Sequence, residues 1–172
     1  EENKLGISSS STRQVFFTDT LIPVENMLAK RGEGFKIAMN SLNVGRIKLG
    51  VACLDASRRI ITESVKYGNE RYQFKVPISS FGAIQKKYAE MSAKTFALDA
   101  GSYRAAKDIQ NMIDALLANG ISHEEAELTA FSEYAIECAI IKVYGSEVSQ
   151  FVSDEGIQIY GGMGFSKDTP ME

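Results

Sequence analysis

Three segments of the sequence combine cations, amides and glycines in patterns that could bind a small ligand. In the first, Leu42, Asn43, Val44, Gly45 and Arg46 interrupt a predicted helix with polar and flexible residues. Asn43 offers a neutral hydrogen-bonding amide and Arg46 a permanent cation, so this segment could form a polar notch that faces a ligand. The alternative is a solvated turn of an ordinary helix.

The second segment gathers an arginine and several rings between two predicted helices. It contains Arg71, Gln73 and Phe74, followed by Phe81 and Gly82. A guanidinium can bind phosphate oxygens in a bidentate manner, and aromatic rings can cover a planar heterocycle, so the combination favours a nucleotide-like cofactor. The alternative is a connection whose rings close the end of a helical bundle.

The third segment consists of Gln158, Ile159, Tyr160, Gly161 and Gly162, where a predicted helix runs into a glycine-rich turn. Glycine lets a backbone approach a ligand closely, and a glutamine amide can recognise an amide or hydroxyl group. The alternative is a helix cap. A cap needs one glycine, however, and residues 161–164 contain three.

Other chemistries are excluded by composition. His123 is the only histidine, and it stands beside two glutamates at a predicted helix start, so we expect neither a histidine-based nucleophilic site nor a metal site. Cys53 and Cys138 lie in apolar helical patterns and are predicted to be reduced core residues of an intracellular protein. The net charge of −3 argues against a nucleic-acid-binding protein. No apolar run is long enough to form a transmembrane segment.

The elements that must position these segments are predicted to be mostly helical. Residues 12–23 are rich in β-branched and aromatic residues, which predicts a short hairpin that needs further structure beside it. After Gly34 the apolar residues recur at helical spacing, which predicts a helix that ends near residues 68–69. Its predicted core stripe contains Ile47, Val51, Leu54, Arg58, Ile61 and Val65.

A second and longer stretch with the same helical spacing predicts a helix from about residue 84 to Asn119 and Gly120. Its core stripe contains Tyr88, Met91, Thr95, Leu98, Ser102, Ala105, Ile109 and Met112. The sequence from Ser122 to Glu125 is a capping box that predicts the start of a third helix. A break at residues 145–149 predicts a fourth helix over 149–160. We therefore predict a mainly α fold, an antiparallel four-helix bundle over residues 32–172, preceded by a β fragment over residues 1–31.

Several motifs accompany the three segments in a fixed order. They include Val15–Phe17, Ile22–Asn26, Gly34–Met39, Leu42–Arg46, Asn69–Phe74, Phe81–Gln85 and Ile157–Phe165. In sequence and spacing this set resembles the C-terminal part of the acyl-CoA dehydrogenase family, most closely its very-long-chain branch. The resemblance covers the whole chain, with residues 1–31 corresponding to the end of the middle β-domain and residues 32–172 to the helical domain.

The resemblance implies a flavoprotein oxidoreductase of fatty acid β-oxidation that converts fatty acyl-CoA to trans-2-enoyl-CoA. A carboxylate would abstract the α proton while the β hydrogen leaves as hydride to FAD. The resemblance assigns Arg71, Gln73, Phe74, Phe81 and Gly82 to FAD across a dimer interface, and residues 158–162 to its ADP end. It assigns residues 42–46 to the substrate pocket. It also implies electron-transfer flavoprotein as a partner and a homodimer or homotetramer formed through the helical domain.

The resemblance further implies that the catalytic glutamate lies beyond Glu172, so no residue of this chain is assigned as catalytic and the chain alone is expected to be inactive. Lys75 stands where the family usually has glycine. The expected location is a bacterial cytoplasm, or else a mitochondrial matrix. The alternative functions are a cofactor-free helical interaction or scaffold module, or a related FAD enzyme acting on a nitroalkane or an acyl-carrier-protein thioester.

Overall fold

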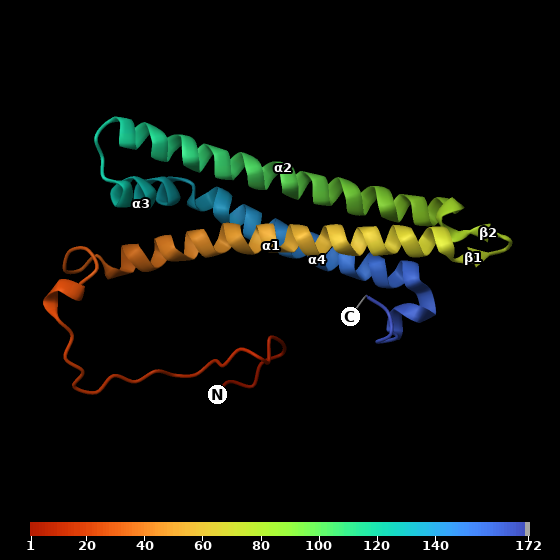
Figure 1. Cartoon of the computed structure of the whole chain (residues 1–172), viewed down its shortest axis with the longest axis horizontal. Helices are drawn as coiled ribbons and strands as arrows, with labels where there is room; N and C mark the ends of the chain where they lie inside the picture. The colour runs from red at the N-terminus through yellow and green to blue at the C-terminus, as the bar shows by residue number, and fades with distance from the viewer. Residues whose placement is uncertain (171–172) are drawn as a thin grey trace. The chain divides into compact units, whose positions relative to one another are not determined.

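The computed structural model describes residues 1–170, which form two compact units divided at Gly34. The larger unit contains four helices and a very short hairpin (Figure 1). The helices are α1 (Gly34–Glu70), α2 (Gly82–Ala118), α3 (His123–Glu133) and α4 (Ala135–Tyr160). Strands β1 (Tyr72–Gln73) and β2 (Val76–Pro77) precede the 3-10 turn η2 (Ile78–Ser80), and the 3-10 turn η3 (Gly161–Phe165) follows α4. The predicted mainly helical fold is confirmed.

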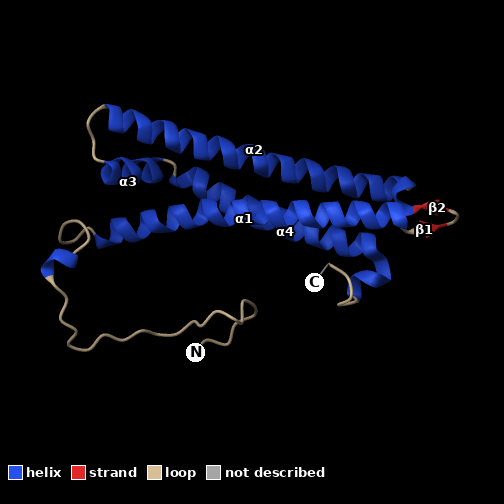
Figure 2. Cartoon of the chain, viewed as in Figure 1, coloured by secondary structure: helices blue, strands red, loops and turns tan. Residues whose placement is uncertain are grey.

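The predicted hairpin over residues 12–23 is wrong. In residues 1–33 the only helical or strand element is the 3-10 turn η1 (Val24–Asn26), and the two strands of the described chain lie between α1 and α2 (Figure 2). A strand needs a neighbour for its backbone hydrogen bonds, and the described residues offer this stretch no other strand. The apolar side chains of Val15, Phe16 and Phe17 are accordingly exposed.

The ends of the helices follow local sequence signals. Ser122 caps α3, because its hydroxyl accepts a hydrogen bond from the backbone N–H of Glu125 at 3.3 Å. Helix α2 ends just before Asn119 and Gly120, and Gly120 has a positive φ of 81°. The predicted start of the third helix after Ser122 and the predicted end of the second helix are both confirmed.

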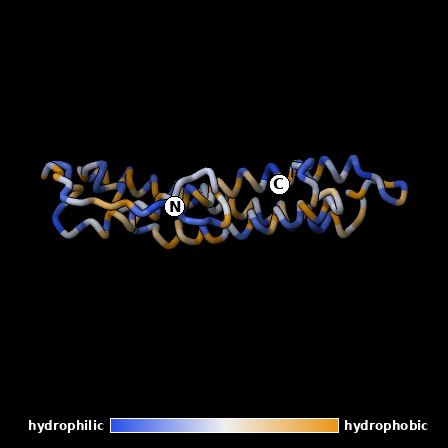
Figure 3. The backbone as a smooth tube through the Cα atoms, turned by 90° about the horizontal axis from the view of Figure 1, so that it is seen from below, coloured by the Kyte–Doolittle hydropathy of each residue, from blue (hydrophilic) through white to orange (hydrophobic). Residues whose placement is uncertain are grey.

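The core stripe of α2 is close to the predicted one. Seven of its residues are buried: Met91, Thr95, Leu98, Ser102, Ala105, Ile109 and Ile113. The two ends of the stripe differ, because Tyr88 is only partly buried and Ile113 is buried where Met112 was expected. Polar and apolar residues alternate along each helix (Figure 3), as expected for helices that each present one face to a shared core.

The buried face of α1 differs from the predicted one. It is formed largely by small residues, with Gly50, Ser57, Ser64 and Gly68 buried beside Leu54. Two members of the predicted stripe lie outside this face. Val51 is 47% exposed, and Arg58 extends toward α2, where it forms an ion pair with Asp99 at 2.6 Å. Small residues allow α1 to approach its neighbours closely, so the largest apolar side chains do not mark its inner face.

The predicted break at residues 145–149 is also wrong. Helix α4 continues through Gly145, and the chain leaves the helical path at Tyr134 instead. Gly145 is a packing residue, because a Cβ atom built on it would lie 2.8 Å from the Cα of Gly50. A Cβ on Gly50 would in turn lie 2.5 Å from Cγ2 of Ile141. The two glycines therefore mark the point where α1 and α4 cross.

Candidate functional site

Two of the three predicted segments meet in one hollow at the end of the bundle. The hollow has a volume of about 460 Å³ and lies between the end of α1, the hairpin and the end of α4. Its lining residues are Tyr67, Arg71, Gln73, Ile78, Ile159, Tyr160, Gly161, Gly162 and Met163. Six of them belong to the predicted cofactor set, although the two segments are far apart in sequence.

Arg71 is held by its backbone and leaves its side chain available. Its N–H donates to the carbonyl of Tyr67 at 2.8 Å, and its own carbonyl accepts from the N–H of Ile78 at 2.9 Å. No carboxylate of the described residues forms an ion pair with its guanidinium. The hollow therefore has one unpaired cation at its edge, which is the arrangement needed to bind an anion.

The hairpin beside Arg71 is held in an unusual backbone conformation. Gln73 pairs with Val76, and the two residues between them, Phe74 and Lys75, have positive φ values of 50° and 68°. Positive φ at both central residues is typical of the type I′ turn, which favours asparagine and glycine. The ring of Phe74 is 88% exposed and meets Phe81 edge-on, with centroids 6.3 Å apart.

Four predicted cofactor residues therefore lie near the hollow without lining it. Phe74 and Phe81 pack on each other, and Gly82, directly after Phe81, begins α2. Gln158 lies in the last turn of α4, where its carbonyl accepts a hydrogen bond from the N–H of Gly161.

The glycine-rich turn after α4 needs glycine for two different reasons. Gly161 has a positive φ of 58°, which turns the chain away from the helix axis. A Cβ on Gly164 would lie 2.5 Å from the carbonyl oxygen of Ile157, so that position has no room for a side chain. Gly162 has open space around it, and its backbone lies at the lining of the hollow.

Tyr67 belongs to this hollow and was not predicted from the sequence. Its ring stacks on the ring of Tyr160, with centroids 4.0 Å apart and planes 13° from parallel. Burial raises the pKa of the Tyr160 hydroxyl, and the nearby Glu63 carboxylate raises it further, so this hydroxyl remains a neutral donor at physiological pH. Tyr67 lies four residues before Arg71, which directly follows α1, so the helical spacing at the end of α1 places both on one side and could have indicated the association.

The first predicted segment forms a different local structure. Asn43 is buried, its side-chain amide donates to the carbonyl of Phe131 at 3.0 Å, and its oxygen accepts from Arg46 at 2.7 Å. Asn40 donates in the same way to the carbonyl of Leu128 at 3.2 Å. The two asparagines therefore fasten α1 to the carbonyls of α3, while Arg46 is held against Asn43 at the edge of this cluster.

The first segment does not meet the other two within one chain. Arg71 is 28 residues further along the same helical path than Asn43. At a rise of about 1.5 Å per residue the two lie about 40 Å apart. A separate hollow of about 510 Å³ lies near the start of α1, and of residues 42–46 only Val44 lines it.

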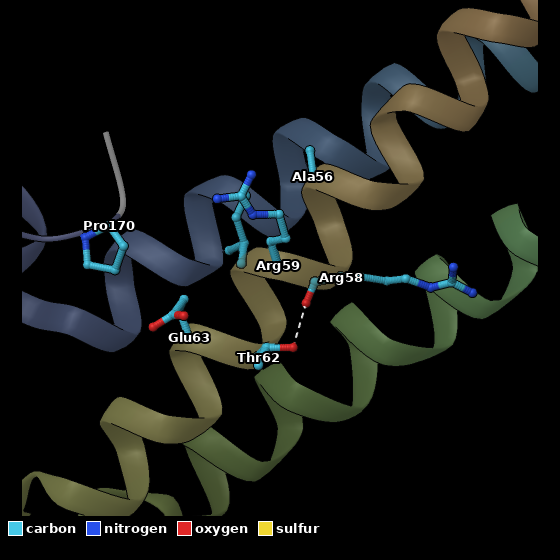
Figure 4. A pocket seen from close by; sticks show the side chains of 7 residues that line it. Ala56, Arg58, Arg59, Thr62, Glu63 and Pro170 are labelled. Carbon is cyan, nitrogen blue, oxygen red and sulfur yellow. Dashed lines mark hydrogen bonds between the residues drawn. The ribbon is translucent and has the colours of Figure 1, made fainter.

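A further hollow of about 450 Å³ lies beside the middle of α1, and none of the predicted site residues lines it. Arg59, Thr62, Glu63 and Pro170 contribute to its lining, while Arg58 points away toward α2 (Figure 4). The hydroxyl of Thr62 donates to the carbonyl of Arg58 at 2.9 Å, so it is already used within the helix.

Comparison with known proteins identifies the family to which the chain belongs. The family model for the C-terminal domain of acyl-CoA dehydrogenases matches residues 32–172. A probable acyl-CoA dehydrogenase of Bacillus subtilis (strain 168) is 39% identical over 172 residues, which are 100% of this chain and 29% of that protein. The human mitochondrial very long-chain specific acyl-CoA dehydrogenase is 37% identical over 171 residues, 99% of this chain and 23% of that protein.

Solved structures agree with the sequence comparison. The crystal structure of an acyl-CoA dehydrogenase complexed with FAD from Bacillus anthracis has a TM-score of 0.78 and 42% identity, covering 90% of this chain and 26% of that one. The chain thus spans less than a third of the length of these relatives. The predicted family resemblance is confirmed, and the chain belongs to the acyl-CoA dehydrogenase family as its C-terminal domain.

Proposed function

We propose that this chain is the cofactor-binding helical domain of an FAD-dependent acyl-CoA dehydrogenase that oxidises fatty acyl-CoA to trans-2-enoyl-CoA. The observation that carries the proposal is the single hollow in which Arg71 and Gln73 face residues 159–162. Membership of the acyl-CoA dehydrogenase family indicates the class of reaction. FAD, when bound, would supply the hydride acceptor.

The residues of the hollow suit a dinucleotide. Arg71 offers an unpaired guanidinium for a diphosphate, and Gln73 offers an amide that can donate and accept. The glycine backbone at residues 161–162 allows close approach of a bulky group. Phe74, Phe81, Gly82 and Gln158 lie next to the hollow, and we propose that they contact those parts of FAD that extend beyond it.

Residues 42–46 are proposed to contact the acyl-CoA substrate. Leu42 is half exposed and Arg46 is partly buried, so both have surface available to a ligand. Asn43 would act mainly by holding Arg46, since its oxygen already accepts from that guanidinium and its amide is bonded to α3. This cluster lies far along α1 from Arg71, so substrate and cofactor contacts of one chain would be separate.

We also propose that this chain has no catalytic activity by itself. Abstraction of the α proton needs a base within hydrogen-bonding distance of the substrate. The family resemblance assigns this base to a glutamate that is not among the residues of this chain, so no carboxylate of the chain is proposed for the role. Glu172, the last carboxylate of the chain, lies outside the described residues and is not proposed as the base.

The partners and location of the whole protein are proposed from the family. A second copy would pack through the helical domain, where Phe96 and Tyr103 of α2 are exposed at positions seven residues apart and so lie on one face. Electron-transfer flavoprotein would accept the electrons. No helix among the described residues has the length and hydrophobicity to span a membrane. A bacterial cytoplasm is the preferred location, with a mitochondrial matrix as the alternative.

Titration of the chain with FAD tests the cofactor proposal. Saturable quenching of flavin fluorescence is expected, and Arg71→Ala should weaken binding roughly tenfold or more because a charge-assisted hydrogen bond is removed. Lys66→Ala is the matched control, since it removes the same charge from an exposed position of α1 that does not line the hollow. Equal affinity of wild type and Arg71→Ala would contradict the assignment and favour a cofactor-free interaction module.

An activity assay tests the second proposal. The chain with FAD, palmitoyl-CoA and a dye acceptor should reduce no dye. Reduction that depends on palmitoyl-CoA would overturn the proposed absence of a base.

A further inference from the structure

Tyr67 and Tyr160 form a reciprocal link between α1 and the end of α4. Besides their stacked rings, the hydroxyl of Tyr67 donates to the carbonyl of Tyr160 at 3.4 Å. The hydroxyl of Tyr160 donates to the carbonyl of Glu63, one turn earlier in α1, also at 3.4 Å. Each tyrosine thus binds the backbone of the helix that carries the other. These bonds are long, so the stacked and buried ring faces should supply most of the stabilisation.

The link lies between the two chemically distinct sides of the hollow. On one side, the carbonyl of Tyr67 accepts the N–H of Arg71, the first residue after α1. On the other side, Tyr160 is the last residue of α4 and directly precedes Gly161. Movement of one ring relative to the other would therefore change the distance between the guanidinium and the glycine backbone.

The first two residues of the turn after α4 are glycines, which have no side chain to hold their own position. Gly161 and Gly162 are exposed, and no neighbouring atom lies where a Cβ would be. Glycine has the greatest conformational freedom in an unconstrained chain. Ordering a mobile segment upon binding lowers affinity, so a turn that is already ordered binds more tightly. Tyr160 is only 7% exposed and provides the fixed point from which this turn starts.

We propose that Tyr67 is a positioning residue of this site: by stacking on Tyr160 it orders residues 161–163 opposite Arg71 before a ligand binds. The proposal rests on the proposed function for the identity of the ligand, FAD, but the ordering of the turn is a property of the chain itself. Tyr67 acts through Tyr160 and is not assigned a catalytic role.

Three variants separate stacking from hydrogen bonding and from general stability. Tyr67→Phe keeps the ring and removes the hydroxyl, whereas Tyr67→Leu removes the ring. Phe35→Leu is the matched control, because it also removes a ring and Phe35 is 77% exposed near the start of α1, where it does not line the hollow. Amide hydrogen exchange of the full chain without ligand is measured first, and titration with FAD second.

In Tyr67→Leu we expect faster exchange confined to residues 159–165 and FAD affinity lower by roughly three- to tenfold, which is the range of a lost aromatic pair. Tyr67→Phe should restore both readouts nearly to wild-type values, and Phe35→Leu should change neither. Unchanged exchange in residues 159–165 of Tyr67→Leu would overturn the proposal. Equal loss of order in Tyr67→Phe would overturn the primary role of stacking.

The outcomes also separate this inference from the proposed function. If the wild-type chain binds no FAD while Tyr67→Leu loosens residues 159–165, the cofactor assignment fails and the ordering role stands. If FAD binds and Arg71→Ala weakens it, but Tyr67→Leu leaves both exchange and affinity unchanged, the cofactor assignment stands and Tyr67 has no positioning role. If Tyr67→Leu does not fold, Tyr160→Phe takes its place, because this variant keeps the stacked rings. The proposal then requires that amide exchange in residues 159–165 of Tyr160→Phe equals that of the wild type, and faster exchange would overturn it.

Discussion

Replacing Gly145 with alanine tests the crossing of α1 and α4. The added Cβ would lie 2.8 Å from the Cα of Gly50 and 3.1 Å from its carbonyl oxygen, whereas ordinary contacts begin at 3.4 Å. Both atoms are backbone, so no side-chain rotation can relieve the contact and the helices must separate by several tenths of an ångström. Overpacking of this kind costs about 1–3 kcal/mol. Alanine returns up to about 1 kcal/mol through its higher helix propensity. The net expectation is about 0–2 kcal/mol of lost stability, whereas the same change at an uncrowded glycine should stabilise the chain.

Gly45→Ala provides the matched control for this measurement. Gly45 lies in the interior of α1 and has no atom within 4 Å of the position a Cβ would take. The same chemical change there should therefore stabilise the chain by about 0.5–1 kcal/mol. Urea denaturation at 25 °C, followed by circular dichroism, measures both variants. If Gly145→Ala stabilised the chain as much as Gly45→Ala does, the close crossing would be refuted.

Three further predictions concern the hairpin and the buried titratable groups. Lys75→Gly should raise the free energy of unfolding by about 0.5–1 kcal/mol, measured by urea denaturation, because glycine adopts the positive φ of this position without strain. Phe74→Gly should raise the free energy of unfolding by a smaller amount, since it also removes the contact with Phe81. Ellman's reagent should modify the partly exposed Cys53 well before the fully buried Cys138, so that Cys53→Ser abolishes the fast phase in stopped-flow absorbance. Burial raises the pKa of the Cys138 thiol above its ordinary 9.0, so the folded state retains this proton more tightly. The contribution of this thiol to stability is constant below about pH 9 and is lost as the pH rises further; denaturation midpoints rising between pH 9 and 11 would contradict this.

Local signals in the sequence were sufficient to predict most helix ends and the inner face of α2. Ser122 and Gly120 act within a few residues of themselves, so their effect does not depend on the rest of the fold. The stripe of α2 could be read because its core positions carry large apolar residues such as Met91 and Leu98. That Arg71 and the glycine-rich turn would belong to one site was predictable for a different reason. Both segments contain more polar residues and glycines than the end of a helical bundle requires.

The errors arose where a residue's role depends on a distant partner. Gly145 has the composition of a helix break, but its contact with Gly50 makes it a packing residue. Val51 has the spacing of a core residue, yet α1 places small residues against its neighbours and leaves Val51 outside. Asn43 was expected to face a ligand, and its amide instead binds the carbonyl of Phe131. No pattern within α1 identifies that carbonyl as its partner.

The separation of Asn43 and Arg71 along α1 constrains how the proposed enzyme could be assembled. About 40 Å of helix lies between them. A ligand held by Arg71 in one chain therefore does not reach the Asn43–Arg46 cluster of the same chain. In a two-fold symmetric dimer, however, residue i of one copy meets residue j of the other and the reverse contact occurs as well. A two-fold arrangement in which Arg71 of each copy lies toward the Asn43 cluster of its mate is the simplest way for two identical chains to form two complete sites.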